Sequence, residues 1–366
     1  MELKIVNFIK QNPDWKEKLS NPPYSLRIKQ KGNLISFKYS QIDSDFSLEI
    51  VNEARGLILE TGTWRPVALA FKKFFNYGEP FAAKIDWNTA KVTSKEDGSL
   101  IKVYFYNSWR VATNSTIDAE DAMLGTDGYK NFRQLFDVAA KNSGLDFDRL
   151  DPRYCYIFEL CSKTNRVVVP YGDAELFHIG TRNMTTLDEE EINIGIQKPR
   201  VYKLSSLEDC IAMAKTFDYT QEGFVVRDQF YNRIKVKSLD YISKHRMVNN
   251  HNMTLERAIE LIRENEVDEF LTYFNNYKDY IDSVKNGFNT LKTKIESDIM
   301  LAKTTKVAIG SDRKTFSEWA KTMILPPVCF KVYDNPDYTA KDYINSLTNK
   351  KIADLIKKLN IECLSF

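Results

Sequence analysis

The chain has 366 residues, and 52 basic against 50 acidic side chains give it a formal charge of +2. The length predicts about two domains, and 43% hydrophobic residues supply a sizeable core. Because the overall charge is near zero, a polyanionic partner would have to bind a local cluster of cations. The five cysteines show no CxxC spacing, which argues against structural zinc and favours a reducing compartment.

No run of residues approaches the ~18 apolar residues that a membrane span needs. The N-terminal segment also lacks the continuous apolar stretch of a signal peptide. We therefore expect a cytoplasmic protein with no membrane partner. Two of the three histidines, His245 and His251, lie in a polar stretch, so histidine-centred acid–base chemistry is not expected.

In chain order, residues 1–12 are predicted to form a short amphipathic helix, because Leu3, Val6 and Ile9 are spaced for one face. Strand-like runs separated by turn residues dominate from about 24 to 240. Helical stretches interrupt them around 118–142 and 205–216. This mixture predicts an α+β domain of largely antiparallel sheets with flanking helices.

After about residue 243 the apolar residues adopt a helical period, as Leu255, Ile259 and Ile262 illustrate. A Pro-rich connector over 324–337 is expected to interrupt these helices. The further helical segments are expected over 267–303, with a break near Asn286-Gly287, over 313–324 and over 340–359. We predict two domains, 1–243 and an all-helical domain over 244–366.

The segment from Lys95 to Gly98, with the sequence KEDG, lies between two strand-like runs. Asp-Gly in that setting predicts a hairpin turn, so Lys95 is either an ordinary exposed side chain at that turn or a reactive amine. Only about one lysine amine in a thousand is neutral at pH 7, and neighbouring cations with partial burial raise that fraction. A nucleophilic Lys95 therefore predicts basic residues near it on rigid strands.

Lys235 and Lys237 supply such residues in the strand-like run RIKVKS. Because a strand has a period of two, both amines point to one face while Ile234 and Val236 point to the other. Two cations on one face repel each other unless an anion such as a phosphate lies between them. Alternatively, this is a solvent-exposed edge strand whose lysines prevent aggregation.

Two carboxylates accompany these lysines. Glu222 precedes Gly223 and an apolar run, at a strand end where it could bind a hard cation. Glu159 interrupts the otherwise uncharged run YCYIFELC, and its burial requires a partner such as a ribose hydroxyl, a metal or a cation. For Glu159 the alternative is a salt bridge to an arginine at the edge of the core.

Two further cations complete the set. Arg55 begins the apolar run RGLIL, and Lys73 lies in the aromatic stretch FKKFFNYGE. Arginine suits a bidentate grip on phosphate, whereas lysine acts as a movable point charge.

Taken in chain order, these residues resemble the signature of the covalent nucleotidyltransferases, the superfamily of ATP-dependent ligases and RNA capping enzymes. The signature comprises KxDG, a strand glutamate, an acidic-glycine pair and a KxK strand. The chain looks closer still to the bacteriophage RNA ligase 1 family, the tRNA-repair type. The segments that carry this likeness are EARGLIL, KFFN, SKEDGSL, FELCSKTNRVVV, EGFVV, IKVKSLDYISKH and SDRKTF.

The resemblance implies a nucleotidyltransferase fold, the ATP-grasp-like adenylation domain of DNA and RNA ligases, in residues 1–243, and an RNA-specificity domain in 244–366. It implies an ATP-dependent RNA ligase that joins 3′-hydroxyl and 5′-phosphate RNA ends through lysyl-AMP and RNA-adenylate intermediates. The implied substrates are ATP and single-stranded RNA ends, in particular tRNA cleaved in its anticodon loop. Mg²⁺ is the implied metal, with Mn²⁺ as a substitute.

The resemblance also implies a monomer that cooperates with an RNA end-healing kinase-phosphatase, in the host-cell cytoplasm if the chain is phage-encoded. In the implied site, the catalytic residues are the nucleophile Lys95, the lysines Lys235 and Lys237, which neutralise charge growing on the α-phosphate, and Glu222, which also binds metal. Asp97 and Gly98 shape the turn, with Gly98 expected at positive φ. The other expected ATP or AMP contacts are Arg55, Lys73, Glu159 (also a metal ligand), Phe177, Val225, Lys235, Lys237 and Tyr241.

Three alternatives stay open at this point. The same chemistry could act on DNA ends or RNA caps, although helices rather than the usual OB-fold follow the KxK strand. A non-catalytic RNA-binding relative is the second. The third is an unrelated α+β protein.

One departure from the family is Asn114, which stands where members tend to have lysine, and either Arg110 or Lys102 could compensate. Six lysines of the helical domain could bind an RNA backbone or simply form a solvated surface. They are Lys314, Lys321, Lys350, Lys351, Lys357 and Lys358.

Overall fold

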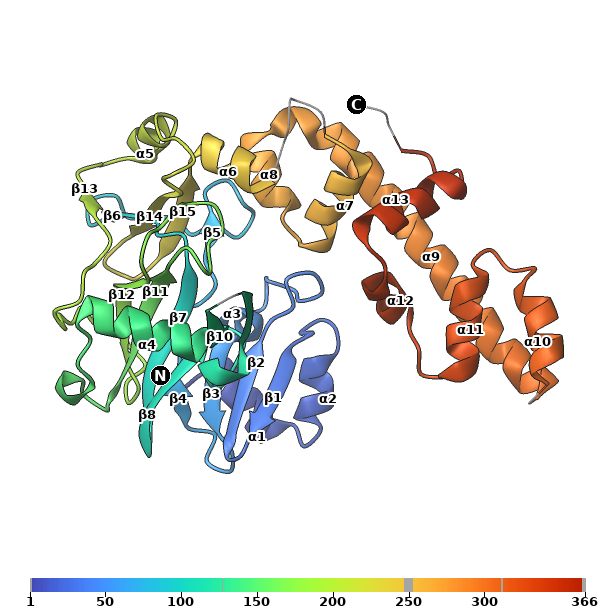
Figure 1. Cartoon of the computed structure of the whole chain (residues 1–366), viewed down its shortest axis with the longest axis horizontal. Helices are drawn as coiled ribbons and strands as arrows, with labels where there is room; N and C mark the ends of the chain where they lie inside the picture. The colour runs from blue at the N-terminus through green and yellow to red at the C-terminus, as the bar shows by residue number, and fades with distance from the viewer. Residues whose placement is uncertain (1, 127, 247–252, 311, 364–366) are drawn as a thin grey trace. The chain divides into compact units, whose positions relative to one another are not determined.

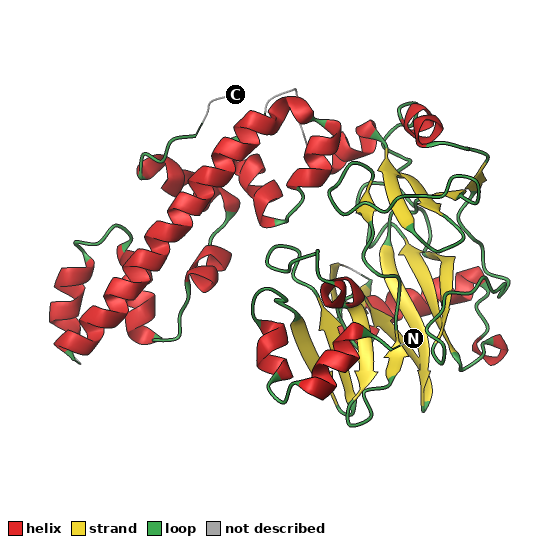
Figure 2. Ribbon diagram, turned by 180° about the vertical axis from the view of Figure 1, so that it is seen from behind, coloured by secondary structure: helices red, strands yellow, loops and turns green. Residues whose placement is uncertain are grey.

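The computed structural model describes residues 2–126, 128–246, 253–310 and 312–363. The chain divides into two compact units, residues 1–247 and residues 248–366 (Figure 1). The predicted fold class is confirmed, because antiparallel sheets with flanking helices form the first unit and helices form the second (Figure 2).

Within the described residues of the first unit, the strands form three larger sheets and one hairpin, and every pair of neighbouring strands is antiparallel except β15 with β5. The first sheet is β1 (Arg27–Lys31), β2 (Leu34–Lys38), β3 (Arg55–Glu60) and β4 (Pro66–Ala68). The second has the order β12 (Glu175–Asn183), β11 (Tyr154–Cys161), β7 (Ser99–Tyr106) and β8 (Ser108–Thr113). The third has the order β13 (Val201–Tyr202), β6 (Lys91–Ser94), β14 (Gly223–Arg227), β15 (Arg233–Lys237) and β5 (Phe75–Asn76).

Helices cover these sheets through their apolar faces. The predicted N-terminal helix is present as α1 (Lys4–Gln11), which buries Ile5, Val6 and Ile9 in a core shared with the first sheet. In another core, α4 (Phe132–Ser143) packs its apolar face with the second sheet. The remaining helices of this unit are α2 (Trp15–Ser20), α3 (Glu49–Glu53), α5 (Leu207–Ala214), which packs with the third sheet, and α6 (Leu239–Arg246).

The helix expected around 118–142 is only partly present. Residues 119–121 form a single 3-10 turn, followed by the hairpin β9 (Met123–Thr126) and β10 (Tyr129–Asn131). The α-helix begins after Asn131, whose side chain accepts a hydrogen bond from the Gln134 backbone N–H. Since this N-cap satisfies a free backbone donor, it sets the start of α4 at Phe132, 14 residues later than expected.

The expected hairpin at Lys95–Gly98 is wrong. The strand before it, β6, belongs to the third sheet, whereas β7 after it belongs to the second. The four residues therefore connect two sheets, and they place Lys95 where the sheets meet. Local turn chemistry could not reveal this connection, because strand pairing depends on partners far away in the sequence.

The second unit is helical throughout its described residues, apart from short connections. Its central helix is α9 (Lys278–Ile309), whose Ile281, Val284 and Ile295 are buried against the other helices. Those helices are α7 (Leu255–Arg263), α8 (Val267–Tyr273), α10 (Arg313–Ala320), α11 (Pro326–Asp334), α12 (Ala340–Ser346) and α13 (Asn349–Lys358).

Two breaks expected in this unit do not occur. α9 runs through Gly287, where a Cβ atom would lie 2.7 Å from the Cys363 Sγ, so glycine here permits close packing rather than ending the helix. The connector over 324–337 contains α11, which begins at Pro326. Proline suits the first turn of a helix, because the backbone N–H that it lacks would have no partner there.

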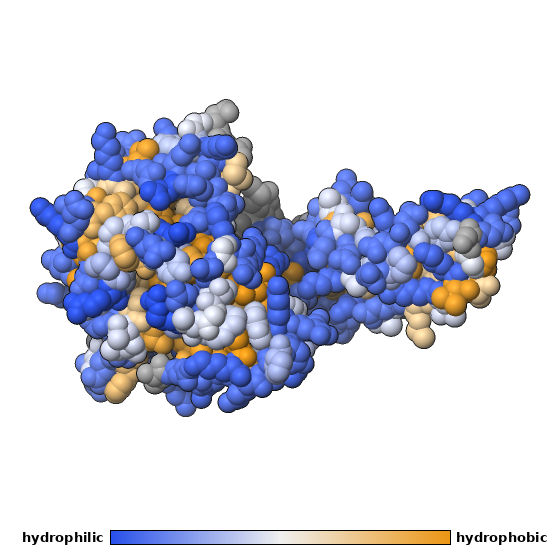
Figure 3. All heavy atoms as spheres, turned by 90° about the horizontal axis from the view of Figure 1, so that it is seen from below, coloured by the Kyte–Doolittle hydropathy of each residue, from blue (hydrophilic) through white to orange (hydrophobic). Residues whose placement is uncertain are grey.

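On the face drawn in Figure 3, hydrophilic residues cover most of the surface, and apolar patches lie among them. Within the described part of the chain, no helix combines the length and the apolar character that crossing a membrane requires.

Candidate active site

A cavity of about 440 Å³ in the first unit collects most of the residues that the sequence predicted. The predicted residues among its lining are Arg55, Lys73, Lys95, Gly98, Glu159, Val225, Lys235 and Lys237. Glu222, Phe177 and Tyr241 lie outside this lining. The lining residues come from all three larger sheets: Arg55 from the first, Glu159 from the second, and Val225, Lys235 and Lys237 from the third. Tertiary structure therefore brings together residues that are far apart in the sequence.

The centre of the site is an ion pair between Lys95 and Glu222. The Lys95 Nζ lies 2.7 Å from the Glu222 Oε2, and the Lys237 Nζ lies 3.5 Å from the Oε1 of the same carboxylate. The Glu222 side chain is only 3% exposed, whereas Lys95 is 22% exposed toward the cavity. Glu222 therefore holds two lysine amines beside the cavity, one from the KxDG segment and one from the KxK strand.

The loop that carries Lys95 is fixed by Asp97, which is buried. One oxygen of its carboxylate accepts hydrogen bonds from the backbone N–H groups of Val168 and Val169, each at 2.8 Å. The other oxygen accepts the hydroxyl proton of Tyr241, also at 2.8 Å. Tyr241 thus contacts the loop that carries Lys95 and is not among the residues that line the cavity.

Gly98 is required for space and not for its backbone angle. Its φ is not positive, contrary to the expectation, but a Cβ atom would lie 2.3 Å from the Leu160 carbonyl oxygen and 2.8 Å from the Cys161 Sγ. Gly223 does have a positive φ of 138°, and a Cβ atom there would lie 2.1 Å from the Val236 carbonyl oxygen. Both glycines let strands that carry site residues approach closely.

Glu159 projects from β11 and lines the cavity. Burial raises the pKa of its carboxyl group from the ordinary 4.5 to about 7, with the charge on Lys95 opposing and that on Glu222 adding to the shift. Within the described residues no arginine forms an ion pair with Glu159, so the salt-bridge alternative is not supported. Because burial makes the Glu159 carboxyl group costly to ionise, we expect it to interact with a ligand hydroxyl or a cation.

Lys235 and Lys237 lie on one face of β15 and both line the cavity, as predicted from their spacing. β15 is paired on both sides, with β14 and β5. The edge-strand alternative is therefore wrong, and the two lysines lie in the cavity wall.

Arg55, at the start of β3, lies with its guanidinium 5.1 Å from the centre of the Phe74 ring. Asn114, the departure from the family, lines the cavity too. Of the two residues that could compensate, Lys102 is completely buried, and its amine donates a hydrogen bond to the Gly56 carbonyl oxygen. Burial lowers the pKa of Lys102 to about 8. Lys102 does not line the cavity, and neither does Arg110.

Lys73 lies in an aromatic cage, with its amine 4.5 Å from the centre of the Phe46 ring and 4.9 Å from that of Phe75. Such cation–π contacts hold the amine at the cavity wall. Of the two expected adenine contacts, Val225 lines the cavity, whereas Phe177 lies outside the lining and packs edge-to-face against Tyr171.

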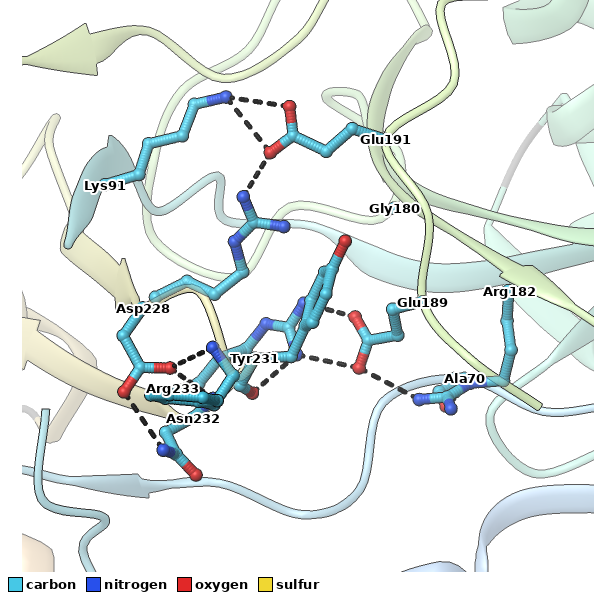
Figure 4. A network of polar contacts seen from close by, with 12 residues as sticks. Ala70, Lys91, Gly180, Arg182, Glu189, Glu191, Asp228, Tyr231, Asn232 and Arg233 are labelled. Atoms are coloured by element: carbon cyan, nitrogen blue, oxygen red, sulfur yellow. Dashed lines mark hydrogen bonds and ion pairs between the residues drawn. The ribbon is translucent and has the colours of Figure 1, made fainter. Parts of the chain in front are cut away.

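Sequence reasoning missed a row of three cations farther along the same sheet. Lys91, Arg227 and Arg233 face each other across β6, β14 and β15. Glu191 pairs with Lys91 and Arg227, and Glu189 pairs with Arg233 (Figure 4). Like charges directly opposite each other are destabilising, so these carboxylates are needed to stabilise the row.

The alternation that identified Lys235 and Lys237 could have found this row, because Lys91 and Lys95 lie an even number of residues apart, as do Val225 and Arg227. His178, which the sequence left aside, also lines the cavity, and burial lowers its pKa to about 4, so it stays neutral near pH 7. His251 and the side chain of His245 lie outside the described residues.

Comparison with known proteins agrees with this geometry. A family model described as RNA ligase, of the T4 RNA ligase 1 type, matches residues 53–244, a range that includes all of the cavity lining except Tyr39. The chain belongs to the RNA ligase family. The resemblance seen in the motifs is thereby confirmed.

Two relatives illustrate the family. An RNA ligase of Rhodothermus phage RM378 is 24% identical over 352 residues, which cover 75% of this chain and 80% of the relative. A protein of Autographa californica nuclear polyhedrosis virus, named as a bifunctional polynucleotide kinase/RNA ligase, is 28% identical over 321 residues. That match covers 82% of this chain but 45% of the viral protein, so the chain spans about half the length of that relative.

Among solved structures, an archaeal ATP-dependent RNA ligase aligns at 13% identity with a TM-score of 0.45, over 69% of this chain and 67% of that one. The assignment rests on the family match and not on this likeness.

Proposed function

We propose that the protein is an ATP-dependent RNA ligase that joins 3′-hydroxyl and 5′-phosphate ends. The observation that carries the proposal is the position of Lys95, whose amine borders a nucleotide-sized cavity, 2.7 Å from a buried glutamate and on the same wall as Lys235 and Lys237. Membership of the RNA ligase family supports it.

In the proposed first step, the Lys95 nitrogen attacks the α-phosphorus of ATP. A P–N bond forms, the bond to the β-phosphate oxygen breaks, and pyrophosphate leaves. The attacking amine must lose a proton, and Glu222 is within reach to accept it. Lys235 and Lys237 lie where they would stabilise negative charge that grows on the α-phosphate.

In the next two steps, the adenylate passes to the 5′-phosphate of one RNA end, which frees Lys95. The 3′-hydroxyl of the other end then attacks that phosphate, forming the phosphodiester bond and releasing AMP. The fixed loop around Asp97 keeps Lys95 in place during transfer.

The residues fit a divalent metal ion that is bound mainly through the substrate. Within the described residues, no three His, Cys, Asp or Glu side chains are arranged to hold a metal ion. Mg²⁺ usually binds through one or two carboxylates together with substrate phosphates. Glu159 and Glu222 would supply those carboxylates, and the ion would neutralise phosphate charge. Mn²⁺ would serve in the same place.

Incubation with α-³²P-labelled ATP and Mg²⁺ tests the first step. We expect label on the denatured chain, removed by pyrophosphate and missing from Lys95→Ala; label that persists in Lys95→Ala would overturn the assignment. Because bound AMP can block labelling, the protein is first treated with pyrophosphate.

The substrate is tested by comparing circularisation of 5′-phosphorylated single-stranded RNA with sealing of nicked duplex DNA. We expect RNA to be preferred, and a preference for DNA ends would favour the alternative function. Within RNA, we propose tRNA cleaved in its anticodon loop as the physiological substrate, with an end-healing kinase-phosphatase supplying the ends. The protein would act as a monomer in the cytoplasm.

For the helical unit we propose a role in RNA specificity. The six lysines that the sequence singled out there are all exposed. Lysines that contact backbone phosphates of RNA must be exposed, but lysines of a solvated surface that binds no RNA are exposed as well. Binding of cleaved tRNA to a variant with all six replaced by Ser separates the two, because only the first role predicts loss of binding.

A further inference from the structure

A second hollow, of about 370 Å³, adjoins the cavity that holds Lys95. Lys73 lines both. The other residues that matter here are three phenylalanines, Phe46, Phe75 and Phe81, and the neighbouring Lys72. We call these residues the aromatic hollow.

Phe81 gives the aromatic hollow an open ring face. Its side chain is 48% exposed, whereas Phe46 and Phe75 are buried. The Phe81 ring lies with its centre 5.7 Å from that of Phe75, which in turn contacts Phe46 at 6.0 Å. The buried Phe75 ring, itself packed against Phe46, therefore supports Phe81, which remains about half exposed to water. An exposed large aromatic side chain that is rigidly supported in this way is typical of a binding surface.

Cations border the same hollow. The Lys73 amine lies over the Phe46 and Phe75 rings, between the hollow and the main cavity. The Lys72 amine pairs with Glu49 at 2.7 Å, and both side chains are about half exposed. Water and salt weaken such a surface pair, so a phosphate can replace the carboxylate at little cost. An aromatic face beside movable positive charge is the combination that binds single-stranded nucleic acid.

We propose that the aromatic hollow binds the base of the RNA nucleotide that carries the 5′-phosphate to be joined. This rests on the proposed RNA ligase function. Since Lys73 belongs to both hollows, a phosphate at its amine enters the cavity near Lys95 while the base of the same nucleotide reaches Phe81. The base stacks on the Phe81 ring, so the site accepts any base and contributes affinity without sequence preference.

The test uses two 5′-phosphorylated RNA donors that differ only in the first nucleotide, which is either normal or abasic. For the normal donor, Phe81→Ala should raise the KM in ligation by about fivefold or more, the lower range for loss of one base–aromatic stack. For the abasic donor, wild type and Phe81→Ala should have the same KM. Phe81→Tyr keeps the ring and should behave as wild type.

The matched control is Phe105→Ala. Phe105 is also a partly exposed phenylalanine supported by another ring, that of Trp109, but it lines neither hollow. It should leave the KM for both donors unchanged. Labelling of the protein with α-³²P-labelled ATP reports folding of each variant, because Phe81 does not line the cavity that holds Lys95.

The outcomes separate the two proposals. If wild type forms no lysyl-AMP or seals no RNA, the proposed function fails. If wild type seals RNA but Phe81→Ala changes the KM equally for both donors, or for neither, the function stands and the aromatic hollow is not a base site.

Discussion

Lys95 and Glu222, 127 positions apart in the sequence, form an ion pair of 2.7 Å at the wall of the cavity. In the proposed mechanism the carboxylate accepts the proton that Lys95 must lose. Glu222→Gln keeps the shape but removes this capacity, so lysyl-AMP formation should slow by about 100-fold or more. Single-turnover labelling with ATP measures the rate.

The control for this prediction is Lys84→Ala, which removes an exposed lysine that lines neither hollow and should label as wild type. Labelling of Glu222→Gln at the wild-type rate would show that Glu222 is not needed for the first step.

Gly98→Ala should destabilise the first unit, because the added methyl group would lie 2.3 Å from the Leu160 carbonyl oxygen. Overpacking of this kind corresponds to a fall in Tm of about 3 to 10 °C. Gly172→Ala is the matched control, since its Cβ meets nothing within 4 Å and its φ is not positive. Calorimetry on both variants checks the prediction, and an equal Tm for the two would contradict it.

Tyr241→Phe removes the hydroxyl that donates to the Asp97 carboxylate, while the two backbone N–H donors remain. The loop should stay folded but hold Lys95 less firmly, so we expect lysyl-AMP formation to slow by about tenfold. Tyr129→Phe, away from both hollows, should have no effect. A normal rate in Tyr241→Phe together with weaker binding of AMP would instead indicate direct contact with the nucleotide.

Glu159 predicts a pH dependence of stability. Its folded-state pKa is about 7 against an ordinary 4.5, so between these values the folded protein binds a proton that the unfolded chain does not. Stability of wild type should therefore fall as the pH rises from 5 to 7, relative to Glu159→Gln, which cannot ionise. Tm measured over this range checks it, and Glu208→Gln, an exposed change on α5, should follow wild type.

Lys102 predicts the opposite trend at alkaline pH. Burial lowers its pKa to about 8, so between pH 8 and 10.5 the unfolded chain binds more protons than the folded protein. Wild-type stability should rise through this window relative to Lys102→Met, which keeps the chain length without the charge. Parallel pH profiles of the two proteins would refute the prediction.

Much of this protein could be predicted from its sequence. Periodicity identified α1 and the change to helices after residue 243, because apolar spacing reports which face is buried. Alternation placed Lys235 and Lys237 on one face, and the structure puts both in the cavity wall.

Other features depended on the tertiary structure. The link between two sheets at Lys95–Gly98, the close approach that Gly98 permits, and the support of Asp97 by Tyr241 all involve residues brought together by folding. The sequence determined which side chains are candidates for the site and, for those on a strand, which face of the strand they occupy, since alternation along a strand is a local property. Only the tertiary structure decided which of them meet, because pairing between strands depends on packing across the whole domain and not on neighbours in the chain.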